Sequence, residues 1–198
     1  MKLILGTLLL AIVAGYVAGG RFSRLASLRI RWAPIALVGL LLQVFVPPGR
    51  WPLVLLLLSF VLLSVFAVRN IAVAGFPLIL IGVALNFLVI GINHGMPVTR
   101  DSLVRSGQMD TLGALIHDGG AKHHLAGPQD HLMFLGDVIA VPPPIGQSAS
   151  VGDLFTFAGV AWLVVGAMTG HATSLIGKRR RAPGVEDDAV TEAGGVAG

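Results

Sequence analysis

Long apolar stretches with uncharged interiors constrain this chain more than any other feature of its sequence. Five of them cover approximately residues 3–20, 32–48, 51–68, 72–92 and 153–172. About 20 helical residues cross the roughly 30 Å hydrocarbon core of a bilayer, so each run is close to spanning length. Because backbone amides in lipid must be hydrogen-bonded internally, such a run predicts a helix. The sequence therefore predicts an all-α fold, a polytopic membrane bundle of about five transmembrane helices.

The composition agrees with a surface that faces lipid. Charged residues make up 12% of the chain and hydrophobic residues 55%, whereas a soluble domain carries about 25% charged residues. The net charge of +4 comes from arginines beside the apolar runs, where they set topology and contact anionic headgroups. We therefore expect membrane lipids, and no nucleic acid, as partners. The absence of cysteine excludes disulfides and thiolate sites.

Arginine and lysine predict the orientation of the bundle. With the amino terminus outside, the inner segments hold nine of these residues and the outer segments five, as the positive-inside tendency requires. The membrane domain then covers residues 1–177, and residues 178–198 form a disordered cytoplasmic tail. The reverse orientation would make the first run a signal peptide after Lys2, but the four arginines that follow that run oppose translocation.

An outer, extracytoplasmic segment of roughly 60 residues, 93–152, separates the last two predicted spans. The chain between Ile92 and Leu154 holds five of the six histidines and six of the ten acidic residues. Its patterns predict short interfacial helices: one capped by Thr99, one capped by Asp110 and ending at His117, and one over residues 131–141. Any chemistry of this protein is expected here.

Asp137 and Asp153 are the candidate catalytic residues. Two carboxyl groups that share a water molecule can perform acid–base hydrolysis when one pKa is raised by the other. A structural interpretation competes with this one, because Ser150 and Asp153 have the spacing of a helix capping box. The structural interpretation is favoured.

His123, His124 and His131 are the candidate metal ligands, with Asp130 and Asp137 nearby in sequence. Imidazole and carboxylate groups are suitable ligands for zinc. The spacing matches no standard zinc pattern, however, so solvated loop histidines are favoured and no cofactor is expected.

Gln43, Asn86 and Asn93 are the main polar residues of the predicted spans, and with Asp137 they are the candidate ligand-binding residues. Gln43 and Asn93 fall toward the outer half of the membrane, where they could form the floor of a pocket beneath the outer segment. An amide in lipid more commonly bonds to a neighbouring helix, which favours a packing role.

Three local motifs carry a resemblance to a known family: residues 93–98 (NHGMPV), 134–139 (FLGDVI) and 150–153 (SVGD). Together with Gly19-Gly20-Arg21 and Gln43, they resemble a family of small bacterial integral membrane proteins defined only as a domain of unknown function. The resemblance covers the chain up to about Lys178. It implies a bacterial cell (plasma) membrane location and supplies no activity. The family motif reads Asn-Gly-X-Met-Pro-Val, so His94 departs from it.

The favoured function is a non-enzymatic, membrane-embedded binding or partner-interaction protein with an outer lid. Its partner would be a lipid, a small apolar ligand, a partner membrane protein or a second copy in a homo-oligomer. The alternative is a membrane-surface hydrolase that uses the aspartate pair or a histidine–aspartate metal site. A small oligomeric transporter ranks third, because the predicted spans hold no charged residue in their interiors.

Overall fold

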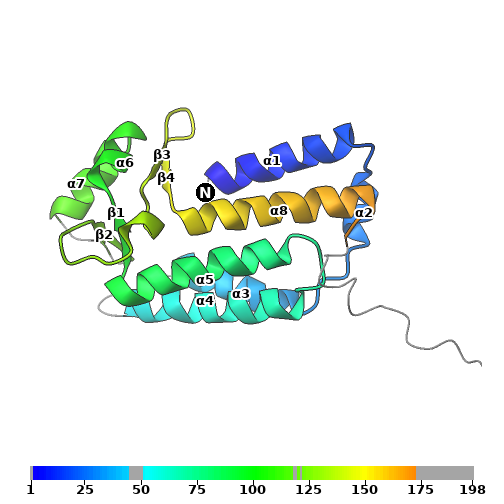
Figure 1. Ribbon diagram of the computed structural model, residues 1–198, viewed down its shortest axis with the longest axis horizontal. Coiled ribbons are helices and arrows are strands. Elements are labelled where there is room, and N and C mark those ends of the chain that lie inside the picture. The colour runs from blue at the N-terminus through cyan, green and yellow to red at the C-terminus, as the bar shows by residue number, and fades with distance from the viewer. Residues whose placement is uncertain (1, 45–50, 118–119, 121, 173–198) are drawn as a thin grey trace, which may run out of the picture.

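The structure is a computed structural model that describes residues 2–44, 51–117, 120 and 122–172 (Figure 1). Five helices of the described chain, here called the long helices, are apolar, have 12 to 19 residues and run along a common axis, each reversing the direction of the one before it. A sixth, short helix, α2, lies at one end. These helices are α1 (Lys2–Val17), α2 (Phe22–Ala26), α3 (Ala33–Val44), α4 (Trp51–Arg69), α5 (Phe76–Asn93) and α8 (Val151–Thr169).

The long helices pack in an order that differs from their order in the chain. Helix α8 lies between α1 and α5, while α4 packs between α5 and α3 (Figure 1). Helix α8 therefore packs between two helices that precede it in the chain. It shares one core cluster with α1, formed around Ala11, Val164 and Met168.

Three of the helices, α4, α5 and α8, are long and apolar enough to cross a membrane. Helix α1 has 16 residues and the described part of α3 has 12, so both are shorter apolar helices. The end of the predicted second span, including Pro47 and Pro48, lies outside the described residues. All five predicted runs contain a helix, and three of these helices reach spanning length.

Glycines allow α5 and α8 to approach closely. A Cβ atom on Gly82 would lie 2.3 Å from the carbonyl oxygen of Gly152, and one on Gly159 would lie 2.7 Å from that of Gly75. Gly152, Gly159 and Gly166 recur every seventh residue along α8, a spacing that keeps them on one face. Small residues at such a contact favour helix association where lipid supplies no hydrophobic driving force.

Large apolar side chains remain exposed along the outer helices. Leu10 on α1 is 71% exposed and Leu41 on α3 is 58% exposed. Water would disfavour this arrangement, whereas lipid tails would not. The exposed surface is thus compatible with a membrane protein.

Residues 96–149 form a compact cap over one end of the bundle. The cap holds two short helices, a 3-10 turn and two pairs of strands, with a small core of Val98, Leu103 and Leu112. Strand β1 pairs with β2 in parallel, and β3 pairs with β4 antiparallel. The elements are β1 (Met96–Val98), α6 (Arg100–Arg105), α7 (Met109–His117), β2 (His123–Leu125), η1 (Met133–Leu135), β3 (Ile139–Val141) and β4 (Gln147–Ala149).

Two of the predicted cap helices are confirmed, and the third prediction is wrong. The Thr99 side chain accepts a hydrogen bond from the Ser102 amide at the start of α6, as expected. Helix α7 ends at His117 as expected, but it begins at Met109, so Asp110 lies in its first turn instead of capping it. Residues 131–141 form the turn η1 and the strand β3 instead of an interfacial helix. Leu132 takes a left-handed conformation with φ of 54°, and the β-branched residues that follow Gly136 favour a strand. The segment between α5 and α8 is therefore a cap of helices and strands rather than a set of helices.

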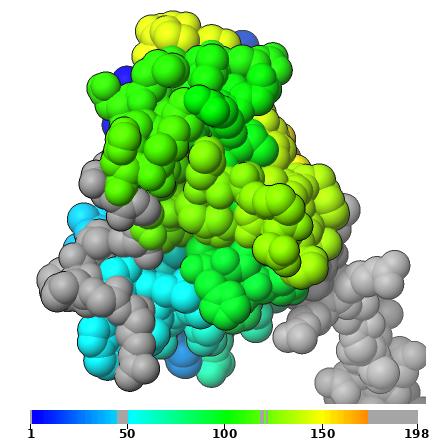
Figure 2. Space-filling view, turned by 90° about the vertical axis from the view of Figure 1, so that its left-hand side faces the viewer, coloured from blue at the N-terminus to red at the C-terminus, as the bar shows by residue number. Residues whose placement is uncertain are grey.

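The start of α1 lies at the same end of the bundle as the cap. The Leu3 amide donates a 3.2 Å hydrogen bond to the Gln147 side-chain oxygen in β4. Seen end-on, the green and yellow-green cap covers most of this face, with the cyan start of α4 visible below it (Figure 2).

Candidate functional site

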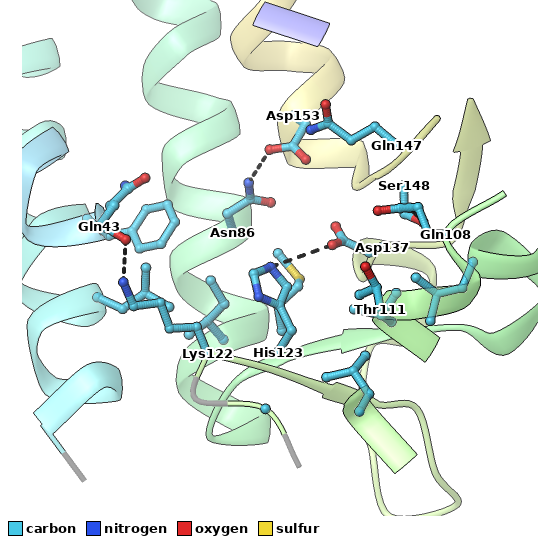
Figure 3. A pocket seen from close by; sticks show the side chains of 18 residues that line it. Gln43, Asn86, Gln108, Thr111, Lys122, His123, Asp137, Gln147, Ser148 and Asp153 are labelled. Carbon is cyan, nitrogen blue, oxygen red and sulfur yellow. Dashed lines mark hydrogen bonds and ion pairs between the residues drawn. The ribbon is translucent and has the colours of Figure 1, made fainter. Parts of the chain in front are cut away.

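A cavity of about 540 Å³ lies where the cap meets the ends of the bundle helices. Figure 3 shows its polar side chains, which come from both parts of the molecule. Ligand pockets in proteins typically measure about 300–1,000 Å³. The lining residues are Gln43, Leu56, Phe60, Asn86, Ile90, Met96, Val98, Leu103, Gln108, Thr111, Leu115, Gly120, Lys122, His123, Asp137, Gln147, Ser148 and Asp153.

Five of the candidate residues named from the sequence meet at this cavity: Gln43, Asn86, His123, Asp137 and Asp153. Asn93 is not among the lining residues. Its side chain donates to the His131 carbonyl and accepts from the His131 amide at 2.9 Å and 2.7 Å. It therefore fastens the cap to the end of α5.

Asp153 caps α8 and joins it to α5. The predicted capping box with Ser150 is present, and the Asn86 amide donates a 2.9 Å hydrogen bond to the other Asp153 oxygen. The Ser150 hydroxyl donates to Asn86 in turn, at 2.8 Å. Because both oxygens of the Asp153 carboxylate accept hydrogen bonds, its first role is structural. Asn86 likewise links two helices, as a packing amide would.

The backbone of Asp137 is held in place by the cap. Its amide donates to the Pro97 carbonyl at 2.9 Å, and its carbonyl accepts from the Ser102 hydroxyl at 2.7 Å. These bonds leave the carboxyl group facing the cavity (Figure 3). Its closest ionic contact in the described chain is His123, with 3.8 Å between Oδ2 and Nε2.

Burial controls the electrostatics of Asp137. The side chain is only 12% exposed, and this desolvation, together with the negative charge of Asp153, raises the pKa of Asp137 to about 7. A carboxyl group with this pKa is protonated in roughly half of the molecules at neutral pH. It can therefore donate or accept a proton near physiological pH.

His123 and Lys122 complete the charged part of the cavity. Desolvation lowers the pKa of the His123 imidazole. Its side chain still keeps 53% of its surface exposed, since it lines the cavity. The negative charge of Asp153 acts in the opposite direction and raises the pKa of His123. Desolvation also lowers the pKa of the Lys122 ammonium, which donates to the Gln43 backbone carbonyl. Lys122 lies on the α3 side, and both carboxyl groups lie across from it (Figure 3).

The remaining part of the cavity wall is apolar. Leu56 and Phe60 come from α4, Ile90 comes from α5, and all three belong to the main core cluster. Met96 and Leu115 continue this apolar surface into the cap. A molecule in the cavity would thus contact both charged and hydrocarbon groups.

The histidines proposed as metal ligands do not converge. His123 and His124 are neighbours in β2, and successive side chains of a strand point to opposite faces. His123 faces Asp137, whereas the His124 ring lies 2.8 Å from Asp130. His131 lies beside Asn93. Among the described residues, which do not include Asp118, no group of three or more histidine and acidic side chains is arranged to hold a metal.

Several cavity residues gave no signal in the sequence. Gln108 donates to the hydroxyl groups of Ser106 and Ser148, at 2.8 Å and 2.9 Å. Thr111, Lys122 and Gln147 also line the cavity. These are common polar residues of turns and strands, and only the folding of the cap brings them to the bundle.

The comparisons with known proteins agree with the resemblance. DUF5317, a family of unknown function, matches residues 25–165. An uncharacterized protein from Thermotoga maritima is 35% identical over 113 residues, which is 56% of this chain and 62% of the relative. The chain thus aligns with less than two thirds of that relative. No solved structure matches.

Proposed function

From the premise that this chain belongs to DUF5317, a family of unknown function, we propose that it is a membrane protein that binds a small amphiphilic ligand under its cap. The observation that carries the proposal is the cavity. Gln43, Asn86, Asp137 and Asp153 are far apart in sequence and line one space of about 540 Å³. Such a space, in which polar groups converge beside an apolar wall, is typical of a small-molecule site.

The proposed topology has five spans, with the amino terminus and the cap outside and the carboxyl terminus in the cytoplasm. The alternating direction of the five long helices supports it, and so does the contact between Leu3 and Gln147 in the cap. Arg21, Arg24 and Arg69 lie at the opposite end of these helices, as the positive-inside tendency requires. The relative from Thermotoga maritima is a bacterial protein, and the membrane proposed here is a bacterial cell membrane.

Filling the cavity tests the binding proposal. Thr111 lines the cavity from α7, so the T111W variant would place an indole ring in it. Met109 lies on the same helix but outside the lining, and is 56% exposed, which makes M109W the matched control. Native mass spectrometry of protein extracted in mild detergent should show a bound small molecule in the wild type and in M109W. T111W should lose it.

Two results would contradict the proposal. One is a wild-type protein that carries no adduct in several detergents and lipid nanodiscs. The other is an adduct that T111W retains as fully as M109W, because the molecule would then be bound elsewhere.

A membrane-surface hydrolase is the second candidate, and one observation favours it. Asp137, with its pKa near 7, and His123 face each other in the cavity, and such a pair can exchange protons with a substrate. The carboxyl pair first considered is less suitable, because Asp153 is engaged by Asn86 and Ser150. Hydrolysis of p-nitrophenyl butyrate that H123A and D137N abolish would support the hydrolase. Equal rates in the wild type and both variants would exclude these two residues.

A further inference from the structure

We propose that the ligand of this cavity is an amphiphile whose headgroup carries a protonated amine, held between the carboxyl groups of Asp137 and Asp153. This inference rests on the proposed function and names the chemical class of the ligand. Its basis is the arrangement of charge and of apolar surface around the cavity.

The first step concerns the unmet bonding capacity of Asp137. Its side chain is nine-tenths buried and faces the cavity. In the part of the chain that the structure describes, its carboxyl contact is the His123 ring at 3.8 Å, which is longer than a hydrogen bond. A buried carboxylate is stabilised by a cationic donor. A ligand ammonium group would provide one.

The second step concerns the other charged groups that face this carboxyl group. Asp153 projects from α8 and adds negative charge, while His123 from β2 is neutral when its pKa is lowered. Lys122 lies on the far side of the cavity, beside Gln43 (Figure 3). The region between Asp137 and Asp153 is therefore the most negative part of the wall, and a cation is the group that complements it.

The third step concerns the shape of the ligand. Leu56, Phe60 and Ile90 form an apolar wall opposite the polar groups of the cap. Burial of hydrocarbon against this wall would add affinity in proportion to the buried area. A primary amine with a hydrocarbon tail satisfies both halves of the cavity. Such an amine could be water-soluble or could be the headgroup of a lipid.

Thermal unfolding of the detergent-purified protein at pH 8 tests the inference with defined probes. n-Octylamine should raise the melting temperature, whereas 1-octanol and octanoate, which match its chain length, should not. For the same rise in melting temperature, D137N should need at least ten times the octylamine concentration that the wild type needs. D101N, which changes an exposed cap acid that pairs with Arg105, should leave it unchanged.

A comparison of pH values gives a second measurement on the unmodified chain. At pH 5 the same rise in melting temperature should need more than ten times the octylamine concentration that it needs at pH 8. The reason is that protonation of Asp137 removes the charge that attracts the amine. An unchanged effect at pH 5 would overturn the inference even if D137N failed to fold.

Short-chain lipids separate the two sources of the amine. Stabilisation by dihexanoyl phosphatidylethanolamine would assign a lipid headgroup, whereas stabilisation by octylamine alone would assign a soluble amine. Equal stabilisation by dihexanoyl phosphatidylcholine, which has no N–H donor, would overturn the inference. If octanol binds as well as octylamine and T111W abolishes both effects, the cavity binds amphiphiles without selecting an amine. In that case the proposed function stands and only this inference fails.

Discussion

At the scale of single residues, Asp137 makes the stability of the fold depend on pH. Its pKa is about 7 in the folded protein, against an ordinary value of 3.8, so the folded state binds more protons than the unfolded state between these values. Stability must then decrease as the pH rises from about 4 to about 7. The carboxyl group costs the most stability above pH 7, where it is ionised in both states.

Replacing Asp137 by asparagine should remove this pH dependence. Between pH 5 and pH 8 the wild type should lose about 2.5 kcal/mol of stability that D137N does not lose. Tryptophan fluorescence can follow the unfolding of both proteins in the same detergent at the two pH values. D101N should behave like the wild type, since its carboxyl group is exposed. Parallel pH profiles for the wild type and D137N would contradict the assignment.

His94 is a second residue whose conformation matters. It ends α5 in the left-handed region, with φ of 56°, where glycine avoids the Cβ strain that other residues experience. The H94G variant should therefore be about 0.5–1 kcal/mol more stable than the wild type. Gly170 ends α8 with φ of 84°, and G170A should shift the melting temperature in the opposite direction. A loss of stability in H94G would mean that the imidazole makes a necessary contact.

At the scale of elements, the pairing of α5 with α8 positions the site. The glycines of this pair allow the backbones to approach, and at the cap end of the contact Asn86 bonds to both Ser150 and Asp153. The polar groups that join these two helices are also part of the cavity wall. Packing and site therefore share the same side chains.

A methyl group at the α5–α8 contact should disturb both the helix packing and the cavity. The Cβ atom of G82A would lie 2.3 Å from the Gly152 oxygen and from the Thr156 hydroxyl, and overpacking of this kind costs about 1–3 kcal/mol. G6A on α1 is the matched control, because no atom lies within 4 Å of its new Cβ. Melting temperatures should fall for G82A and stay level or rise for G6A. The idea of a close contact fails if the two variants unfold alike.

At the scale of the whole molecule, the five long helices and the cap give the chain two distinct ends. The cap and the start of α1 share one end, while α2 and the loop that leads to α3 lie at the other. The proposed topology assigns the cap end to the outside of the cell. This assignment can be tested chemically because the natural chain has no cysteine.

Single cysteines should report the two ends separately. D101C places a thiol on the exposed surface of α6, and S23C places one on the exposed surface of α2. In intact cells a membrane-impermeant maleimide should label D101C at once and S23C only after permeabilisation. The reverse pattern would invert the topology, and labelling of both in intact cells would contradict a membrane-spanning bundle.

The sequence predicted the bundle well and the cap only in part. Apolar runs specify helices because lipid, like a hydrophobic core, forces the backbone to bond within itself. The helix N-caps formed by Thr99 and Ser150 were also predictable, since each depends on a residue three positions further along the chain. The strand at 139–141 was missed because it depends on pairing with residues 147–149.

The same distinction between local and distant contacts explains the candidate site. Asp137, Asp153, Gln43 and Asn86 were notable because polar residues are scarce near apolar runs. Gln108 and Ser148 were not, because polar side chains are common in loops and their contact spans 40 positions. Adjacent histidines such as His123 and His124 diverge in most backbones, so their separation in β2 was expected, whereas the partner of each ring depends on the fold.

The glycine contacts between α5 and α8 also have a mechanical consequence. Where two backbones are in direct contact, no flexible side chains lie between them that could rearrange. This side of the cavity should therefore stay rigid. The opposite side includes Lys122, which reaches α3 through its long, rotatable side chain. Any molecule that enters should therefore displace the cap and α3, and leave α5 and α8 where they are.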